Sequence, residues 1–232
     1  VLSSVNYAIN KSSLVTCVSE NLKLQTLKYF DISHNIHVIP NFIRFSSNNL
    51  KKKEMTNKKT ITHISNFRPV KRTPDVVDIF FKIQKQIDSQ LVMIGEGPDL
   101  QKTKELVNRY KIQDSVQFVG KSKDIEGFLR STDLFLLPSE SESFGLVALE
   151  AMSFRIPVVT TNSGGVVELV HHNKNGYTCD VGDVHDMASK SVLLLSNSNL
   201  YLEFSKYAYN TSKKYDLEKI ILQYEKCYLS LL

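Results

Sequence analysis

Residues 134–150 read LFLLPSESESFGLVALE, and the predicted fold extends outward from this stretch. Its first four residues are wholly apolar, too few for a helix and without the alternation of a half-exposed strand, so they predict a buried strand of a parallel sheet. Pro138 ends that strand, and Phe144 and Gly145 lead into a helical pattern. The stretch therefore predicts a loop between the carboxyl end of a strand and a helix amino terminus, where open α/β sheets bind ligands and backbone N–H groups hold phosphate.

The alternation of strand and helix patterns continues on both sides of this stretch. Strands are predicted at residues 61–64, 91–94, 116–119, 134–137 and 158–160. One helix is predicted after Thr73 as its N-cap, one from Asp124 to Arg130, and one after Gly145. Further helices are predicted at residues 100–110, 166–170, 184–195, 200–213 and 216–231. Strands separated by such helices imply right-handed crossovers. The predicted fold class is therefore α/β, with a doubly wound parallel sheet.

Residues 1–40 carry a shorter pattern, with helices near 5–9 and 22–30 and strands at 14–19 and 36–39. Such a fragment cannot cover both faces of a sheet, so we expect it to be the tail end of an amino-terminal domain. Residues 41–59 are polar and rich in Lys and Asn, which predicts a surface linker.

Composition excludes several classes of protein. With 232 residues and 42% hydrophobic content, the chain can bury a sizeable core, and no run approaches the roughly 20 apolar residues of a membrane span. A net charge of +5 tolerates an anionic substrate without indicating nucleic acid. Cys17, Cys179 and Cys227 are far apart, which favours reduced thiols and a cytoplasmic protein over a disulfide framework or a zinc site. The six histidines show no metal spacing and are predicted to lie on the surface.

Two glutamates, Glu142 and Glu150, stand eight residues apart across the loop and the following helix. Glu142 precedes the helix and can reach a polar substrate at the sheet edge. Glu150 lies about two turns in, and its carboxylate can accept two hydroxyl hydrogen bonds, as a ribose offers. An isolated pair of glutamates is more often two solvated acids, so this interpretation depends on the surrounding sequence.

A second polar loop, residues 65–72, reads SNFRPVKR and follows the first strand of the regular series. Arg68, Lys71 and Arg72 place three cations within five residues, and such a loop can converge on one pyrophosphate. A solvated basic loop is the commoner case for an isolated pattern of this kind. Its place at a strand end favours a phosphate site.

Residues 138–152, PSESESFGLVALEAM, resemble the E-x7-E signature of the retaining glycosyltransferases of family 4, which have the GT-B fold. Within that family, the wording is similar to the branch that makes N-acetylglucosaminyl-malate for bacillithiol. Val18-Ser19-Glu20 and residues 38–41 (VIPN) match the family's crossing from the first domain to the second. The resemblance covers nearly the whole chain, as the carboxyl-terminal portion of a two-domain enzyme. It implies the tail of an acceptor domain at 1–40, a Rossmann-like nucleotide-sugar-binding domain at 60–215, and a final helix at 216–232 that crosses back to the first domain.

The resemblance also implies roles for individual residues. Arg68 with Lys71 or Arg72 would neutralise the leaving diphosphate, Glu142 would orient the sugar, and Glu150 would hold the ribose. The backbone after Val119 would bond the base. The implied catalytic residues are Glu142, Arg68 and Lys71, and the implied substrate-binding residues are Asn66, Arg72, Gly120, Lys121, Phe144, Gly145, Leu146 and Glu150. No metal or other cofactor is implied, and the D-x-D metal motif of the other major transferase fold is absent from the sequence.

The implied reaction transfers N-acetylglucosamine from UDP-N-acetylglucosamine to L-malate with retention. We expect malate to be held by the other domain, so that these residues alone bind donor without transfer, and we expect the apolar N-terminal and C-terminal segments to favour self-association into a homo-oligomer. Two alternatives stay open. One is a cell-wall or capsule polysaccharide transferase of the same fold, and the other is a non-catalytic UDP-binding remnant.

Two further stretches bear on this resemblance. Arg155 stands where the family usually has a glycine that ends a helix with positive φ, so we expect either a local cost of about 1 kcal/mol or more for that conformation or a different helix end. Gly164-Gly165 with Glu168 resembles the family's GG-x-x-E element near the donor site, although two glycines there can equally serve the turn alone.

Overall fold

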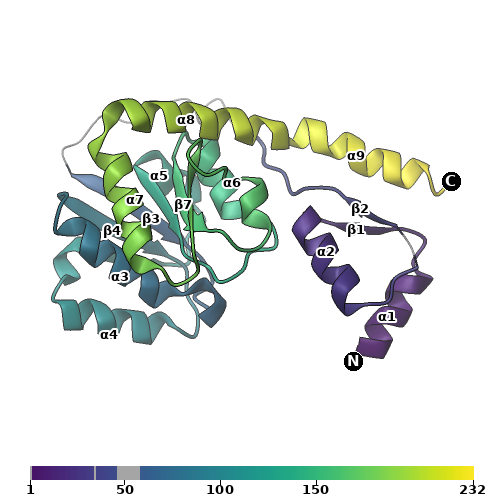
Figure 1. Ribbon diagram of the computed structural model, residues 1–232, viewed down its shortest axis with the longest axis horizontal. Helices are drawn as coiled ribbons and strands as arrows, with labels where there is room; N and C mark the ends of the chain where they lie inside the picture. Colours follow the sequence, from purple (N-terminus) through teal and green to yellow (C-terminus); the bar gives the residue numbers. More distant parts are fainter. Residues whose placement is uncertain (1, 34, 46–57) are drawn as a thin grey trace.

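The computed structural model describes residues 2–33, 35–45 and 58–232 (Figure 1). Most of the predicted linker, residues 46–57, lies outside the described residues.

Six parallel strands form the main sheet, in the order β5-β4-β3-β6-β7-β8. The strands are β3 (Lys59–Ile64), β4 (Ser89–Ile94), β5 (Val116–Gly120), β6 (Leu134–Leu137), β7 (Val158–Thr161) and β8 (Gly176–Cys179). The helices between and after them are α3 (Thr73–Gln84), α4 (Leu100–Tyr110), α5 (Ile125–Arg130), α6 (Leu146–Ser153), α7 (Val184–Ser196), α8 (Ser198–Ser212) and α9 (Leu217–Leu229). The predicted doubly wound parallel sheet is confirmed.

The sheet is buried on both faces because helices cover both of them, and successive side chains of each strand point to opposite faces. In β6, Leu134 and Leu136 belong to one apolar cluster, which includes side chains of α3 and α7. Phe135 and Leu137 belong to a second cluster, which includes side chains of α5, α6 and α8. All four β6 side chains are completely buried, as the apolar run predicted.

The prediction of elements from the sequence needs correction at three places. Strand β8 was not predicted, because its residues GYTC form a short edge strand that starts with a glycine. The helix expected at 166–170 is a 3-10 turn, η4 (Gly165–Glu168). Thr73 is not the N-cap of α3 but its first residue, since it is fully buried and hydrogen-bonded to Thr103, and Arg72 takes the N-cap position with φ 50°.

At the end of α6, Arg155 adopts the left-handed conformation and not a different helix end, with φ 64°. Its N–H bonds to the carbonyl of Met152, and the N–H of Ile156 bonds to the carbonyl of Ala151, which together form a Schellman motif. The guanidinium carbon of Arg155 lies 4.3 Å from the ring centroid of Tyr209, and this cation–π contact offsets part of the backbone cost.

The N-terminal elements are α1 (Leu2–Lys11), β1 (Val15–Cys17), α2 (Glu20–Tyr29) and β2 (Ile36–Val38), and β1 pairs with β2 in a separate two-stranded parallel sheet. Ile43 joins this region to the start of α9, because its carbonyl accepts the N–H of Leu217. From there, α9 extends toward the side of the N-terminal elements (Figure 1).

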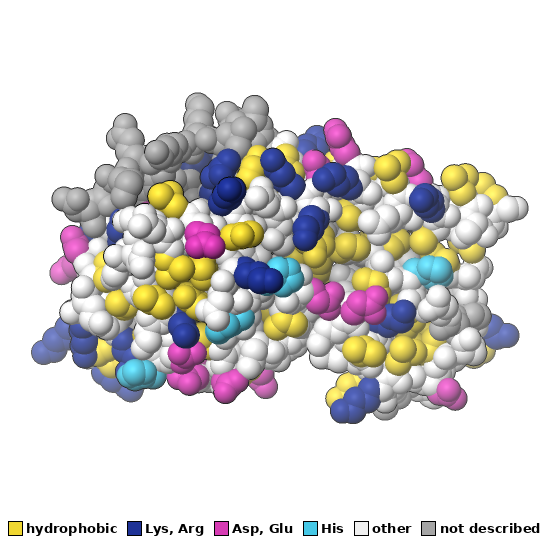
Figure 2. Space-filling model, turned by 45° about the horizontal axis from the view of Figure 1, so that its top comes forward, with side chains coloured by type: hydrophobic (Ala, Val, Ile, Leu, Met, Phe, Trp, Pro, Cys, Tyr) yellow, Lys and Arg dark blue, Asp and Glu magenta, His cyan; other side chains and the backbone are white. Residues whose placement is uncertain are grey.

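This end of the molecule leaves many apolar side chains exposed, and Figure 2 shows them at its right. Helix α2 buries no residue, and α9 buries only Ile220. None of the described helices has both the length and the apolar character that a membrane crossing requires. The domain limits inferred from the sequence stay predictions.

Candidate functional site

The two polar loops singled out in the sequence follow neighbouring strands. Residues 65–72 follow β3 and residues 138–145 follow β6, and these strands pair with Ile61 opposite Leu134. The strand order reverses between β3 and β6, because β4 and β5 extend one way and β7 and β8 the other. Open α/β sheets bind ligands outside the carboxyl ends of the strands at such a reversal. The topology therefore brings both loops to one candidate site.

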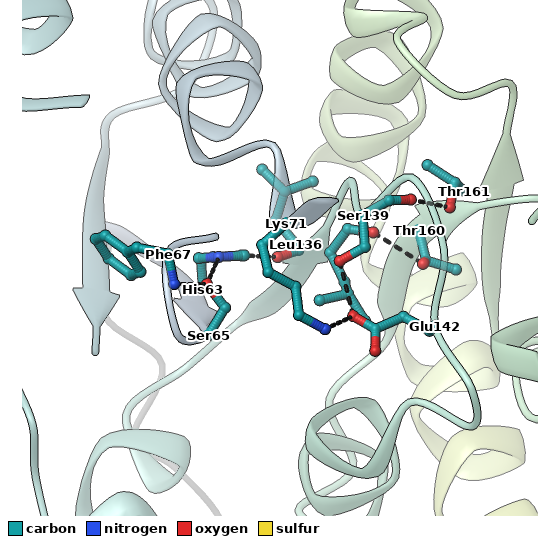
Figure 3. Close-up of polar contacts among 10 residues, drawn as sticks. His63, Ser65, Phe67, Lys71, Leu136, Ser139, Glu142, Thr160 and Thr161 are labelled. Carbon is teal, nitrogen blue, oxygen red and sulfur yellow. Dashed lines mark hydrogen bonds and ion pairs between the residues drawn. The ribbon is translucent and has the colours of Figure 1, made fainter. Parts of the chain in front are cut away.

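An ion pair joins the two loops. Lys71 Nζ lies 2.7 Å from Glu142 Oε1, and the side chains are only 20% and 10% exposed (Figure 3). Lys71 ends the 3-10 turn η2 (Pro69–Lys71), and Arg72 then turns into α3 in a left-handed conformation. Arg72 bonds Asp75 through both Nε and Nη2, each at 2.7 Å. Of the two cations that the sequence could not separate, Lys71 is the one brought to Glu142.

Glu142 is held by further contacts within its own loop. Ser139, which is fully buried, donates its hydroxyl to Glu142 Oε1 at 2.7 Å, and its carbonyl accepts the hydroxyl of Thr161 at 2.6 Å (Figure 3). Two partners on one carboxylate oxygen, of which Ser139 is itself bonded to Thr161 of β7, fix the position of the Glu142 side chain.

The double glycine after β7 packs against the backbone of the Glu142 loop. The N–H of Gly165 donates to the carbonyl of Glu142 at 2.5 Å. A Cβ on Gly164 would lie 2.4 Å from that same carbonyl oxygen, and a Cβ on Gly165 would lie 2.1 Å from the carbonyl oxygen of Ser143. The two glycines are therefore required by the close approach of two loops, and not by a turn alone.

Glu150 differs from Glu142 in having no ionic or hydrogen-bonding partner for its carboxylate among the residues that the structure describes. It lies in the second turn of α6 and is partly exposed. Burial raises the pKa of the Glu150 carboxyl above its ordinary value. An acid that is partly desolvated and unpartnered can accept hydrogen bonds from a ligand without breaking a bond to the protein.

The amino terminus of α6 completes this side of the site. Gly145, with φ 90°, takes the N-cap position, and no side chain of the described residues caps the helix. Phe144 is buried against Tyr215, whereas Leu146 is 39% exposed. Because the first N–H groups of a helix have no partner within it, they are available to an anion.

The remaining predicted residues lie on the same edge of the sheet. Asn66 and Arg68 are exposed, and Arg68 forms no ion pair with any described residue. Gly120 ends β5 with φ 74°, and its carbonyl accepts the N–H of Gly95. Lys121 is exposed, with Nζ 3.8 Å from the carboxylate of Glu96. The structure gives Gly120 and Lys121 no contact with the Lys71–Glu142 pair.

Glu168 makes a contact that sequence reasoning missed. Its two carboxylate oxygens accept the N–H groups of Glu20 and Asn21, at the start of α2. The adjacent Ser19 donates its hydroxyl to the carbonyl of Ser143 at 2.6 Å. The GG-x-x-E element thus connects the N-terminal region to the Glu142 loop.

The surface prediction for the histidines is wrong for His63, which lies in β3 and is fully buried. Of the other described histidines, His37, His171, His172 and His185 are exposed. Among the described residues, no three or more His, Cys, Asp or Glu side chains gather in a group that could hold a metal ion.

The family pattern described as "Glycosyl transferases group 1" matches residues 46–211. One similar protein is the N-acetyl-alpha-D-glucosaminyl L-malate synthase of Bacillus anthracis, 36% identical over 98% of this chain and 62% of its own length. Another is the poly(ribitol-phosphate) alpha-N-acetylglucosaminyltransferase of Staphylococcus aureus, 29% identical over 91% of this chain and 43% of its own length. The chain thus spans less than two thirds of either relative.

Solved structures show the same architecture. A mutant of S. aureus TarM, in complex with fondaparinux, alpha-GlcNAc-glycerol and UDP, matches with a TM-score of 0.87 and 26% identity, over 97% of this chain and 45% of TarM. HepE of Anabaena in complex with UDP-glucose matches with a TM-score of 0.88 over 100% of this chain and 67% of HepE. At 23% identity, the second likeness shows the fold alone.

Proposed function

Because the chain belongs to the group 1 family of glycosyl transferases, we propose that it forms the donor half of a retaining transferase. The proposed reaction moves N-acetylglucosamine from UDP-N-acetylglucosamine to L-malate. The similarity to the B. anthracis malate synthase supports this choice of donor and acceptor. The observation that carries the proposal is the Lys71–Glu142 pair at the strand-order reversal, beside the uncapped start of α6.

The proposed mechanism is electrostatic. Negative charge develops on the diphosphate as it leaves the sugar, and fixed donors aimed at that charge lower the barrier. Lys71 and Arg68 supply cations, and the first N–H groups of α6 supply oriented dipoles. We propose that these groups neutralise the diphosphate without a metal ion. When the diphosphate binds, it would share Lys71 with Glu142.

The two glutamates have separate proposed roles. Glu142, already bonded by Lys71 and Ser139, orients the sugar beside the diphosphate. Glu150, which has no described partner, accepts the ribose hydroxyls. The backbone at Gly120 and the Lys121 loop are proposed to face the base.

We place the reaction in the cytoplasm. Cys17, Cys179 and Cys227 are all free thiols, which fits a reducing compartment.

The donor proposal is tested by titration calorimetry with UDP in excess chelator, and GDP serves as the matched control. We expect UDP to bind in chelator and to bind more tightly than GDP. Loss of UDP binding in chelator, restored by magnesium or manganese, would contradict the metal-free mechanism. Absence of UDP binding under both conditions would contradict the donor site itself.

A polymer acceptor is the second candidate, favoured by the similarity to the S. aureus poly(ribitol-phosphate) transferase. The two acceptors are separated by assaying the protein, in the full length that its gene encodes, with UDP-N-acetylglucosamine and either L-malate or poly(ribitol phosphate). We expect mass spectrometry to show glucosaminyl-malate. Sugar transfer to the polymer alone would replace malate in the proposal.

A further inference from the structure

His63 is a fully buried polar side chain in β3, the strand that leads to residues 65–72, which we call the cationic loop. Its Nδ1 lies 2.9 Å from the carbonyl oxygen of Leu136, and its Nε2 lies 2.8 Å from the hydroxyl of Ser65 (Figure 3). A carbonyl oxygen only accepts, so Nδ1 carries the proton and donates it. Nε2 is then the acceptor, and the Ser65 hydroxyl donates to it.

Ser65 connects the imidazole of His63 to the backbone of the cationic loop. Its oxygen also accepts the N–H of Phe67 at 3.2 Å. Phe67 is fully buried and has a φ of 41°, a left-handed conformation that is unfavourable for a residue with a side chain. Such a conformation persists only where the surroundings hold it.

The turn after β4 supports the same loop from the other side. Gly95 and Gly97 approach so closely that a Cβ would lie 1.8 Å from the carbonyl oxygen of Ser65 and 1.9 Å from that of Asn66, respectively. Asp99 donates its N–H to the carbonyl of Phe67 at 2.9 Å. The backbone before Arg68 is therefore fixed by His63 of its own strand, through Ser65, and by the turn that follows β4.

We propose that His63 is a positioning residue for diphosphate binding: through Ser65 it fixes residues 65–67, and through Leu136 it holds this loop in register with the Glu142 loop. Leu136 is the next-to-last residue of β6, so one imidazole links the strands that carry both loops. This inference rests on the proposed donor site. His63 itself contacts no ligand in it.

Burial keeps the His63 imidazole in one protonation state. It lowers the pKa of His63 to about 4, and the nearby charge of Lys71 acts in the same direction. His63 therefore stays neutral at ordinary pH, and Nε2 remains an acceptor for Ser65.

The test compares the affinities for UDP and for uridine, because only UDP carries the diphosphate. Ser65→Ala removes the link to Phe67, and His63→Asn retains a donor for Leu136 but places no acceptor at the position of Nε2, where Ser65 donates. His63→Gln can place an oxygen near the position of Nε2. Thr62→Val is the matched control, since Thr62 is a buried hydroxyl on the same strand whose partner Thr132 has a second bond to Phe128.

We expect Ser65→Ala and His63→Asn to weaken UDP about tenfold, the effect of one lost hydrogen bond, and to change uridine affinity less than about twofold. His63→Gln should recover part of the UDP affinity, and Thr62→Val should alter neither ligand. Ligand-observed NMR measures both affinities.

Equal weakening of UDP and uridine, unchanged UDP affinity in Ser65→Ala, or a selective UDP loss in Thr62→Val would overturn the positioning role. If a His63 variant fails to fold, Ser65→Ala decides, because it leaves the buried imidazole in place. A wild-type chain that does not bind UDP would instead contradict the donor site on which the inference rests.

Discussion

Residues 65–72 and residues 138–145 reach the same edge of the sheet, but they are held in place differently. Side-chain hydrogen bonds from His63 and glycine contacts from the neighbouring β4 turn hold the first loop. Backbone contacts with Gly164 and Gly165 hold the second, and the hydroxyl of Ser19 reaches it from the N-terminal region. The Lys71–Glu142 pair joins the cationic loop to the Glu142 loop, and the Glu142 loop is also bonded to the segment that precedes α2.

The largest expected effect comes from a substitution at Gly165, which packs against the Glu142 loop, residues 138–145. Gly165→Ala would place a Cβ 2.1 Å from the carbonyl oxygen of Ser143 and 2.7 Å from the hydroxyl of Ser19, so backbone must move. We expect a loss of about 3 kcal/mol in the free energy of unfolding, measured by urea denaturation. Gly120→Ala is the control, because its Cβ would meet only the flexible Glu96 side chain, at 3.2 Å. Its expected cost is about 1 kcal/mol, and equal losses would contradict the close-approach explanation.

Low pH should reduce the free energy of unfolding through His63, the residue that supports the cationic loop. The folded pKa of His63 is about 4, against 6.5 for the free side chain, so the unfolded state binds more protons between these values. His63's contribution to stability is therefore fully present above about pH 6.5 and declines as the pH falls toward 4, by up to about 3 kcal/mol. Urea denaturation from pH 7.5 to 4, compared with His63→Gln, isolates this contribution. Parallel pH profiles for the two proteins would show that His63 does not titrate in this way.

Lys71 and Arg72 are adjacent cations, but only Lys71 faces the Glu142 loop, so substitutions at the two positions should have different effects. Lys71→Met removes a cation and leaves Glu142 without it, so we expect UDP affinity to fall by roughly 2 kcal/mol, or about thirtyfold. Arg72→Met should change UDP affinity less than about twofold, because Asp75 already holds that guanidinium. Calorimetry measures both, and a larger loss in Arg72→Met would reverse the assignment.

The smallest expected effect concerns the link to the N-terminal region. Glu168→Gln keeps the shape but removes the charge that accepts the N–H groups of Glu20 and Asn21, so we expect a cost of about 1 kcal/mol. Hydrogen exchange should become faster at residues 20–22 and stay unchanged at residues 65–67. Faster exchange in both segments would show that the Glu168 contact also supports residues 65–67.

The sequence predicted the strands and helices whose signals are local. The apolar run of β6 and the Asp124 cap of α5 gave correct bounds because each signal lies within the element itself. Strand β8 was missed because its four residues at the sheet edge begin with Gly176 and lack a long apolar run.

The site was predictable in its residue types but not in its pairings. Lys71 and Arg72 are adjacent in sequence, and only the 3-10 turn before α3 sends one to Glu142 and the other to Asp75. The burial of His63 depends on a carbonyl 73 residues away, which no local pattern encodes. The contact of Glu168 with Asn21 spans 147 residues and is equally invisible in the sequence.

The contrast between the two glutamates tests the proposed donor site most directly, by calorimetry of UDP with Glu150→Gln and Glu142→Gln. Glu150→Gln should weaken UDP by roughly 1 to 3 kcal/mol, because a charged acceptor for the ribose is lost. Glu142→Gln should leave UDP affinity nearly unchanged, because the only part of the donor that Glu142 is proposed to contact is the transferred N-acetylglucosamine, which UDP lacks. Equal weakening by both substitutions, or weakening by Glu142→Gln alone, would contradict the assignment of ribose to Glu150 and sugar to Glu142.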